Sequence, residues 1–129
     1  MQTPAHAVLI VEDDEPTRAL LSAIVARNGL RPVAARDGKS GLALLQNAIF
    51  DAVLLDLLLP ELSGVEILAD LAEKMPDVLP RVLVVTAALE PEWMARIEVK
   101  RAHAVIRKPF DVKHLEKEMM ACCLKERPR

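Results

Sequence analysis

Five short, mostly apolar runs recur along the chain, and each is bounded by charged or turn-forming residues. Runs of four or five such residues are typical of strands that are buried on both faces of a parallel sheet. We therefore predict strands at residues 7–11, 31–35, 52–55, 82–85 and 104–106.

Apolar residues at helical spacing fill the stretches between these strands. The fourth of these stretches, with Trp93, Met94 and Ile97 on one side, has the weakest amphipathic pattern, so the ends of its helix are the least defined. Turn residues and helix-capping residues mark where the helices start. We predict five helices, which begin near Pro16, Asp37-Gly38, Ser63-Gly64, Glu90-Pro91 and Asp111.

Strict alternation of strands and helices favours a parallel sheet with right-handed crossovers and helices on both faces. The predicted fold class is therefore α/β, a doubly wound (βα)5 arrangement of the flavodoxin-like kind. No linker, internal repeat or change of composition divides the chain. We expect one domain over residues 1–129, with its core at about 7–125.

Composition narrows the range of functions. The chain has 129 residues, and its hydrophobic fraction of 52% comes from aliphatic rather than aromatic side chains, which make up 2%. A net charge of −2 gives no general attraction to nucleic acid or membrane, and no apolar run reaches membrane-spanning length. The N-terminal stretch 1–4 lacks the regions of a signal peptide, and the two cysteines are adjacent. We therefore expect a reducing, cytoplasmic setting.

Polar side chains follow four of the predicted strands at the point where each strand ends. Glu12 and Asp13 follow the first strand, Asp56 the third, Thr86 the fourth and Lys108 the fifth. All strands of a parallel sheet end at the same edge, so these residues are expected to be neighbours in space. A core needs no such group of three acids, a hydroxyl and an ammonium.

This group of residues predicts a particular chemistry. Three close carboxylates repel one another unless a hard cation lies among them, and Mg²⁺ prefers oxygen ligands. A lysine ammonium and a threonine hydroxyl are suited to phosphoryl oxygens. We therefore predict a site for a phosphoryl group bound by Mg²⁺ and Lys108, with the central carboxylate of Asp56 as a nucleophile.

The chain resembles the receiver domain of the two-component response-regulator family, the CheY-like domains, from about residue 7 to residue 125. Four short motifs carry the resemblance because they occur in the right order, at the ends of the right strands. They are VEDDEP at 11–16, LLDLLLPELSG at 54–64, VVTA at 84–87 and KPF at 108–110.

The resemblance implies a role for each residue of the site. Asp56 is expected to be the phosphoacceptor, while Thr86 and Lys108 bind the phosphoryl oxygens. The peptide between Lys108 and Pro109 is expected to be cis. The implied Mg²⁺ ligands are Asp13, Asp56, the backbone carbonyl of Leu58, and Glu12 through a water molecule.

The implied partners follow from the same resemblance. A histidine kinase or a histidine phosphotransfer protein would present a phosphohistidine to Asp56, as in a phosphorelay. Phosphorylation would draw Thr86 inward and repack the face formed by the fourth helix, the fifth strand and the fifth helix, where a downstream protein would bind. The protein is thus expected to be a signalling module, not an enzyme in the turnover sense. Family members often dimerise through the fourth and fifth helices, so a homodimer stays open.

Three departures from the family pattern affect these expectations. The position three residues before the lysine is usually Tyr or Phe but is Val105 here, so the threonine–aromatic coupling is incomplete. Arg101-Ala102 replaces the usual Gly-Ala before the fifth strand. Leu58 and Ala88 occupy positions that tune water access to the acyl phosphate, and neither can orient an attacking water. Our hypothesis is therefore a long-lived acyl phosphate.

Two other functions are compatible with parts of the sequence. One is a receiver-like scaffold that binds a partner without phosphorylation, for which Val105 leaves room. The other is a small Mg²⁺-dependent phosphohydrolase with an aspartyl-phosphate intermediate. The segment 13–17 superficially resembles the nucleophile motif of haloacid-dehalogenase-type enzymes, but that motif needs Asp where this chain has Glu15, and no cap domain is present in the sequence.

Overall fold

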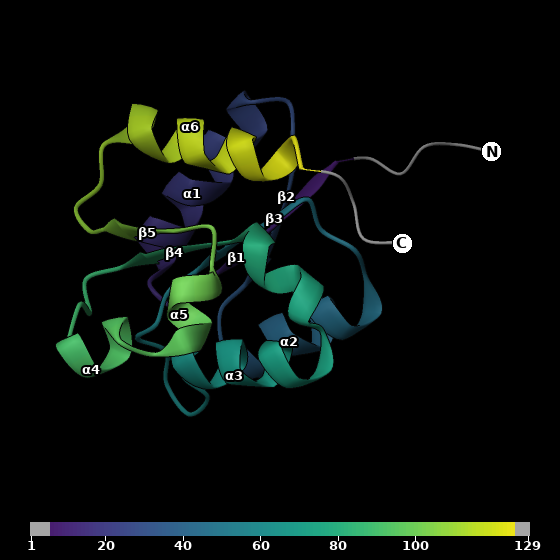
Figure 1. The fold of residues 1–129 in the computed structure, drawn as a ribbon. Helices are drawn as coiled ribbons and strands as arrows, with labels where there is room; N and C mark the ends of the chain where they lie inside the picture. The colour runs from purple at the N-terminus through teal and green to yellow at the C-terminus, as the bar shows by residue number, and fades with distance from the viewer. Residues whose placement is uncertain (1–5, 126–129) are drawn as a thin grey trace.

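A five-stranded parallel sheet forms the centre of the molecule (Figure 1). The structure is a computed structural model, and it describes residues 6–125; the N-terminal stretch 1–4 discussed above lies outside them. The strand order is β2-β1-β3-β4-β5, as in doubly wound flavodoxin-like folds, which confirms the predicted fold class. The strands are β1 (Ala7–Val11), β2 (Arg31–Ala35), β3 (Ala52–Leu55), β4 (Val82–Thr86) and β5 (Ala104–Arg107).

Helices cover both faces of this sheet. In Figure 1, α1 and α6 lie on one side of the strands, and α2, α3, α4 and α5 lie on the other. Within the described residues, no helix has both the length and the apolar character needed to cross a membrane. The helices are α1 (Glu15–Arg27), α2 (Gly38–Asn47), α3 (Gly64–Lys74), the 3₁₀ helix η1 (Pro76–Arg81), α4 (Pro91–Met94), α5 (Ile97–Arg101) and α6 (Val112–Cys123).

The sheet separates two hydrophobic cores. Alternate residues of β1 point to opposite faces, so Leu9 belongs to one core and Ile10 to the other, and both are fully buried. The core that contains Ile10 includes Leu21 of α1 and Leu115 of α6. The three central strands, β1, β3 and β4, are buried along their whole length, as expected for strands covered on both sides.

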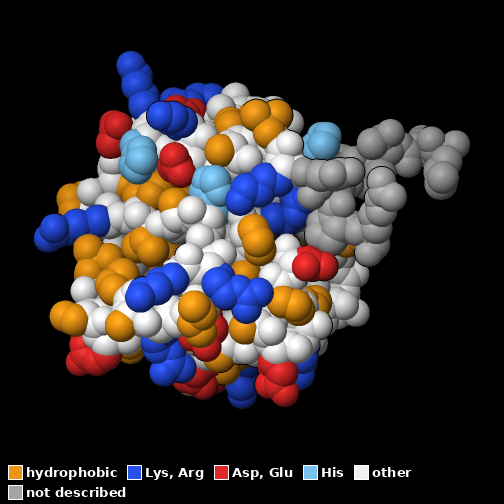
Figure 2. Space-filling model, in the orientation of Figure 1, with side chains coloured by type: hydrophobic (Ala, Val, Ile, Leu, Met, Phe, Trp, Pro, Cys, Tyr) orange, Lys and Arg blue, Asp and Glu red, His pale blue; other side chains and the backbone are white. Residues whose placement is uncertain are grey.

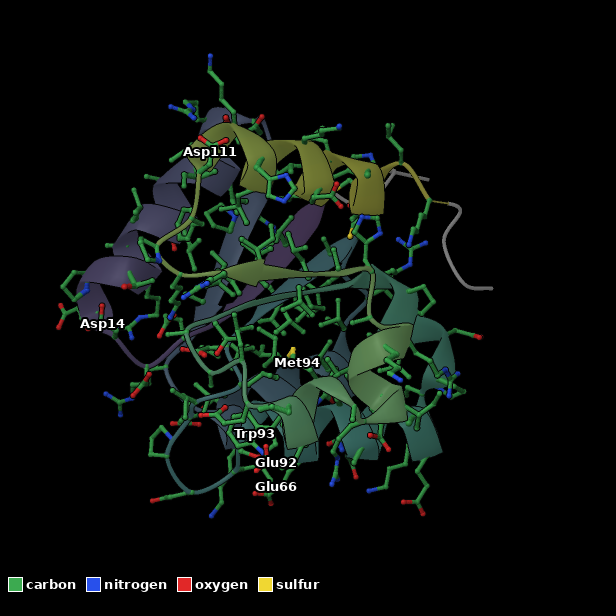
Figure 3. The ribbon with its side chains drawn as sticks, turned by 60° about the vertical axis from the view of Figure 1, so that its left-hand side comes forward. Asp14, Glu66, Glu92, Trp93, Met94 and Asp111 are labelled. Atoms are coloured by element: carbon green, nitrogen blue, oxygen red, sulfur yellow. The ribbon has the colours of Figure 1, made fainter. Side chains whose placement is uncertain are left out.

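Side-chain caps fix the starts of the longer helices. Asp14, Asp37 and Asp111 each accept a hydrogen bond from the backbone N–H three residues later. Figure 3 shows Asp14 and Asp111 at the starts of α1 and α6. Ser63 forms a capping box with Glu66 at the start of α3. The starts predicted for these helices are therefore confirmed.

The prediction of one fourth helix and of five helices in all was wrong. Two short helices, α4 and α5, occupy that stretch, because the backbone of Arg96 is extended (φ −66°, ψ 137°). Trp93 and Met94 pack against the core, whereas Ile97 is 62% exposed and does not share their side. Helical stability in proteins comes mainly from packing of an amphipathic face, which this stretch lacks. The 3₁₀ helix η1 was also not predicted.

Candidate functional site

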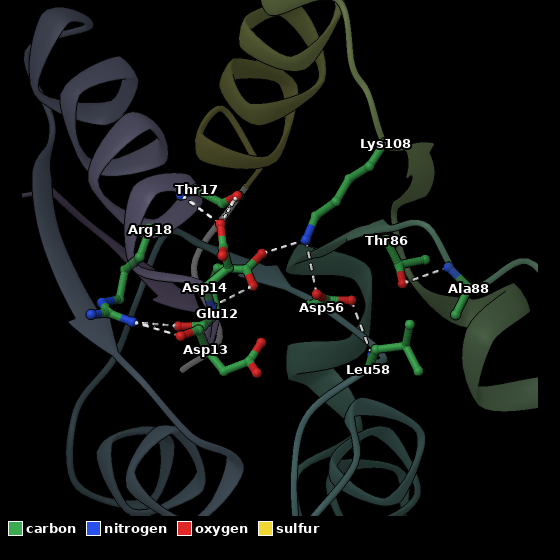
Figure 4. Close-up of polar contacts among 10 residues, drawn as sticks. All are labelled: Glu12, Asp13, Asp14, Thr17, Arg18, Asp56, Leu58, Thr86, Ala88 and Lys108. Atoms are coloured by element: carbon green, nitrogen blue, oxygen red, sulfur yellow. Dashed lines mark hydrogen bonds and ion pairs between the residues drawn. The ribbon is translucent and has the colours of Figure 1, made fainter.

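The carboxyl edge of the sheet brings the predicted site residues together. Glu12 and Asp13 directly follow β1, and Asp56 directly follows the neighbouring strand β3. One carboxylate oxygen from each of these three residues lies within 4.8 Å of those from the other two. Lys108 follows β5 and reaches the same place (Figure 4). The geometric prediction from strand ends is thus confirmed for these four residues.

Lys108 bridges the two buried carboxylates. Its Nζ lies 2.9 Å from Oδ2 of Asp56 and 2.5 Å from Oε1 of Glu12. Burial acts to lower the pKa of Lys108, but the hydrogen bonds that its ammonium donates to Asp56 and Glu12 outweigh this effect and raise the pKa above its usual value. The ammonium therefore stays charged at neutral pH. The peptide between Lys108 and Pro109 is cis, as the resemblance implied.

Glu12 is almost entirely buried, with 1% of its surface exposed. Burial raises the pKa of its carboxyl, and the hydrogen bonds from Lys108 and from the Asp14 N–H oppose that rise. The Asp14 N–H donates to Oε2 at 3.1 Å, so each oxygen of Glu12 already has a protein donor. The Glu12 carboxylate is therefore fixed in place by protein donors at both oxygens.

Asp56 is held in place from several directions. The Leu58 N–H donates to Oδ1 at 3.0 Å, and Lys108 donates to Oδ2. The backbone N–H of Asp56 donates to the Val11 carbonyl of the neighbouring strand at 3.2 Å. Only 6% of its surface is exposed. The carboxylate therefore has a fixed orientation within an otherwise apolar strand end.

The mouth of the site is open to solvent on the Asp13 side. The side chain of Asp13 is exposed, in contrast to those of Glu12 and Asp56. Leu58 is 52% exposed and lies beside Asp56 (Figure 4). The site therefore has a buried inner part, where one ammonium bridges two carboxylates, and an exposed carboxylate at the rim.

Thr86 lies on the same edge but has a different set of contacts. It is fully buried, and its hydroxyl oxygen accepts a hydrogen bond from the Ala88 N–H at 3.1 Å. Its carbonyl accepts from the Lys108 N–H at 3.0 Å, which ties the end of β4 to the lysine. Val105 lies on β5, two residues before its last residue Arg107; it is half-buried and packs against the core.

Two contributors were not identified as site residues from the sequence. Arg18, in the first turns of α1, donates from one guanidinium nitrogen to the carbonyls of Glu12 and Asp13. Asp14 caps α1, and its N–H also donates to Glu12. Backbone contacts of this kind leave no residue-type signature. The sequence could have indicated Arg18 only through its position, since it follows Glu12 and Asp13 by about one to two helical turns.

The donor set fits a hard divalent cation. Three carboxylates with oxygens within 4.8 Å of one another match the oxygen preference of Mg²⁺, and the exposed rim leaves room for the waters that Mg²⁺ keeps. No sulfur or imidazole ligand belongs to this cluster of described residues, which argues against zinc or copper.

The strand order and this acidic edge with its lysine define the class of signalling domains that accept a phosphoryl group on aspartate. The chain belongs to the response regulator receiver domain family, whose sequence pattern it matches over residues 8–120. It is thus a receiver domain of two-component signal transduction. Glu15 of the segment that resembled a phosphohydrolase motif is an exposed residue that opens α1.

Relatives and solved structures agree with this assignment. The phosphate regulon transcriptional regulatory protein PhoB of Escherichia coli is 36% identical over 112 residues, which are 86% of this chain and 48% of PhoB. The chain thus spans about half the length of that relative. A CheY-like receiver domain from Methanospirillum hungatei superimposes with a TM-score of 0.82, at 25% identity over 92% of this chain and 93% of that one. The response regulator TrrA of Thermotoga maritima was solved in complex with Mg²⁺–BeF. It superimposes with a TM-score of 0.80 at 22% identity, over 91% of this chain and 98% of that one.

Proposed function

We propose that Asp56 is the phosphoacceptor of this receiver domain. The observation that carries the proposal is the bridge from Lys108 to Asp56 and Glu12 beside a third carboxylate. Asp56 directly follows the central strand β3, and Lys108 and the Leu58 N–H hold its two carboxylate oxygens. Glu12 is held in a similar way by Lys108 and the Asp14 N–H, but it is more deeply buried, with 1% of its surface exposed against 6% for Asp56. A carboxylate fixed in this way is a suitable nucleophile for a phosphoryl group.

The same residues would hold Mg²⁺. Asp13 and Asp56 would be direct ligands, with the backbone carbonyl of Leu58, and Glu12 would act through a water molecule. When bound, Mg²⁺ neutralises negative charge on the phosphoryl oxygens. The fit of the carboxylates to a hard cation supports this assignment, as does the Mg²⁺–BeF complex of TrrA.

The chain's own residues would carry the phosphoryl transfer as follows. An oxygen of Asp56 forms a bond to phosphorus while the N–P bond of a phosphohistidine breaks and the imidazole leaves. Lys108 stays protonated, and its hydrogen bond to the Asp56 carboxylate is replaced by one to a phosphoryl oxygen, whose negative charge it stabilises. The hydroxyl of Thr86 would turn from its own loop to donate to a second phosphoryl oxygen.

The donor would be a histidine kinase or a histidine phosphotransfer protein, and the output would be a change at the face formed by α4, α5, β5 and α6. Figure 2 shows Lys and Arg side chains among apolar patches on this side of the molecule. The half-buried Val105 would replace the usual aromatic switch, so rearrangement of the short helices α4 and α5 would carry the signal. A homodimer through this face is a further form of the same output.

The proposed setting is a cytoplasmic signalling pathway, because both cysteines are free thiols. Residues 7–125 would be the folding unit. The domain would act by protein contact or phosphate relay, not by turnover of a substrate. Since Leu58 and Ala88 cannot orient water, the acyl phosphate would be long-lived, which timed loss of label would test.

The experiment that tests the proposal is intact mass after incubation with acetyl phosphate and Mg²⁺. Wild type should gain one phosphate, and Asp56→Asn should gain none. Asp77→Asn is the matched control, because Asp77 is exposed on η1, so it should behave as wild type. An equal adduct on Asp56→Asn would overturn the assignment. Partner binding that is unchanged in Asp56→Asn would favour the phosphorylation-independent scaffold.

A further inference from the structure

Arg18 connects the first helix to the loop that carries two of the site's acids. Its Nη1 lies 3.0 Å from the carbonyl oxygen of Glu12 and 3.3 Å from that of Asp13 (Figure 4). The side chain is half-buried and comes from the second turn of α1. One guanidinium nitrogen therefore holds two consecutive carbonyl groups at the point where the chain leaves β1.

These two carbonyls lie where the sheet no longer supplies partners. The Glu12 N–H still bonds to the Ala35 carbonyl at 3.1 Å, as an extension of the β1–β2 pairing. Beyond it, the chain turns into α1, and the Glu12 and Asp13 carbonyls point to Arg18 instead. These two carbonyls belong to the peptide groups on either side of the Asp13 Cα. Arg18 therefore fixes the backbone direction from which the Asp13 side chain projects.

Asp13 depends on such backbone control more than its neighbours do. Glu12 is buried with donors on both oxygens, whereas the Asp13 carboxylate is exposed at the rim of the site. A ligand on a loop must be held near its productive geometry by surrounding hydrogen bonds if it is to bind a metal well. We propose that Arg18 is a positioning residue that presents the Asp13 carboxylate to Mg²⁺.

This inference rests on the proposed function, because it takes Asp13 as a ligand of Mg²⁺. It also predicts the direction in which the affinity for Mg²⁺ changes when Arg18 is replaced, and this direction distinguishes a positioning role from a purely electrostatic one. A positive charge near a divalent cation repels it, so a purely electrostatic Arg18 would weaken Mg²⁺ binding, and its neutralisation would tighten binding. If Arg18 instead positions Asp13, its removal weakens Mg²⁺ binding.

The test is calorimetric titration with Mg²⁺ alone, without any phosphodonor. Arg18→Met keeps the length and apolar stem of the side chain and removes both its charge and its donors, while Arg18→Lys keeps the charge and one donor group. Arg27→Met is the matched control, because Arg27 lies in the last turn of the same helix and pairs with Glu116. Thermal unfolding without Mg²⁺ establishes that each variant is folded.

We expect Arg18→Met to raise the Kd for Mg²⁺ by about tenfold, as for other residues that orient a metal ligand. Arg18→Lys should have an intermediate Kd, and Arg27→Met should match wild type. Unchanged or tighter binding by Arg18→Met would overturn the inference and leave the proposed function intact. If Arg18→Met does not fold, wild-type affinity in Arg18→Lys would overturn it. Failure of wild type itself to bind Mg²⁺ would instead refute the magnesium site of the proposed function, and the inference with it.

Discussion

Substitution of Gly64 by alanine should damage the site without changing any of its polar side chains. Gly64 is the first residue of α3, and its N–H donates to the Leu57 carbonyl at 3.0 Å. A Cβ at this position would lie 2.6 Å from Cα of Leu57 and 3.0 Å from the carbonyl carbon of Asp56, and it would also clash with the Asp56 carbonyl oxygen. These atoms are backbone, so no side-chain rotation can relieve the contact.

The size of the effect follows from this geometry. Ordinary van der Waals contact begins at about 3.4 Å, so the Asp56–Leu57 peptide must move by roughly 0.8 Å from its 2.6 Å approach. Overpacking of this kind costs about 1–3 kcal/mol, and a rigid backbone neighbour places Gly64→Ala near the upper end. The better helix propensity of alanine offsets at most about 1 kcal/mol. We expect a net loss of about 2 kcal/mol, and a phosphorylation rate lower by about 100-fold, because the carboxylate itself is displaced by nearly 1 Å.

Urea unfolding and the initial rate of phosphate gain from acetyl phosphate, followed by intact mass, measure the two effects. Gly29→Ala is the control. Gly29 has φ +77° and open space around its Cα, so alanine there costs about 1–2 kcal/mol of left-handed backbone strain but moves no site residue. If Gly64→Ala phosphorylates at the rate of Gly29→Ala once both are fully folded, the argument from close backbone approach is refuted.

Three further predictions concern a cap, the thiols and the lysine. Ser63→Ala should lose about 1 kcal/mol in urea unfolding, because the capping box at the start of α3 disappears; an unchanged midpoint would contradict this. Burial raises the pKa of Cys122 to about 12 and of Cys123 to about 11, so iodoacetamide at pH 8 should label both far more slowly than in urea, with Cys122 the slower. The raised pKa of Lys108 stabilises the fold fully below 10.5, its unfolded value, and this stability is lost as pH rises through the higher folded value. The difference in free energy of unfolding between wild type and Lys108→Met should therefore shrink above pH 10.5. A difference that does not change with pH would contradict this role of Lys108.

The sequence by itself determined the fold class and most of the site. Short apolar runs are typical of strands buried on both faces, and their alternation with helices indicates a parallel sheet whose strands all end at one edge. The placement of Glu12, Asp13, Asp56 and Lys108 around one point follows from that rule alone. Caps such as Asp111 were also readable, since they act within one helical turn.

Only the tertiary structure decided the features that depend on contacts between distant backbones. The break at Arg96 that divides α4 from α5 reflects how Trp93 and Met94 pack on the core, which no local periodicity specifies. The need for glycine at position 64 arises because the loop after β3 passes directly over the start of α3. Arg18 likewise matters through carbonyl groups, which every residue has. A sequence records side chains, so it reveals which groups can do chemistry, whereas the folded backbone determines which of them are held in position.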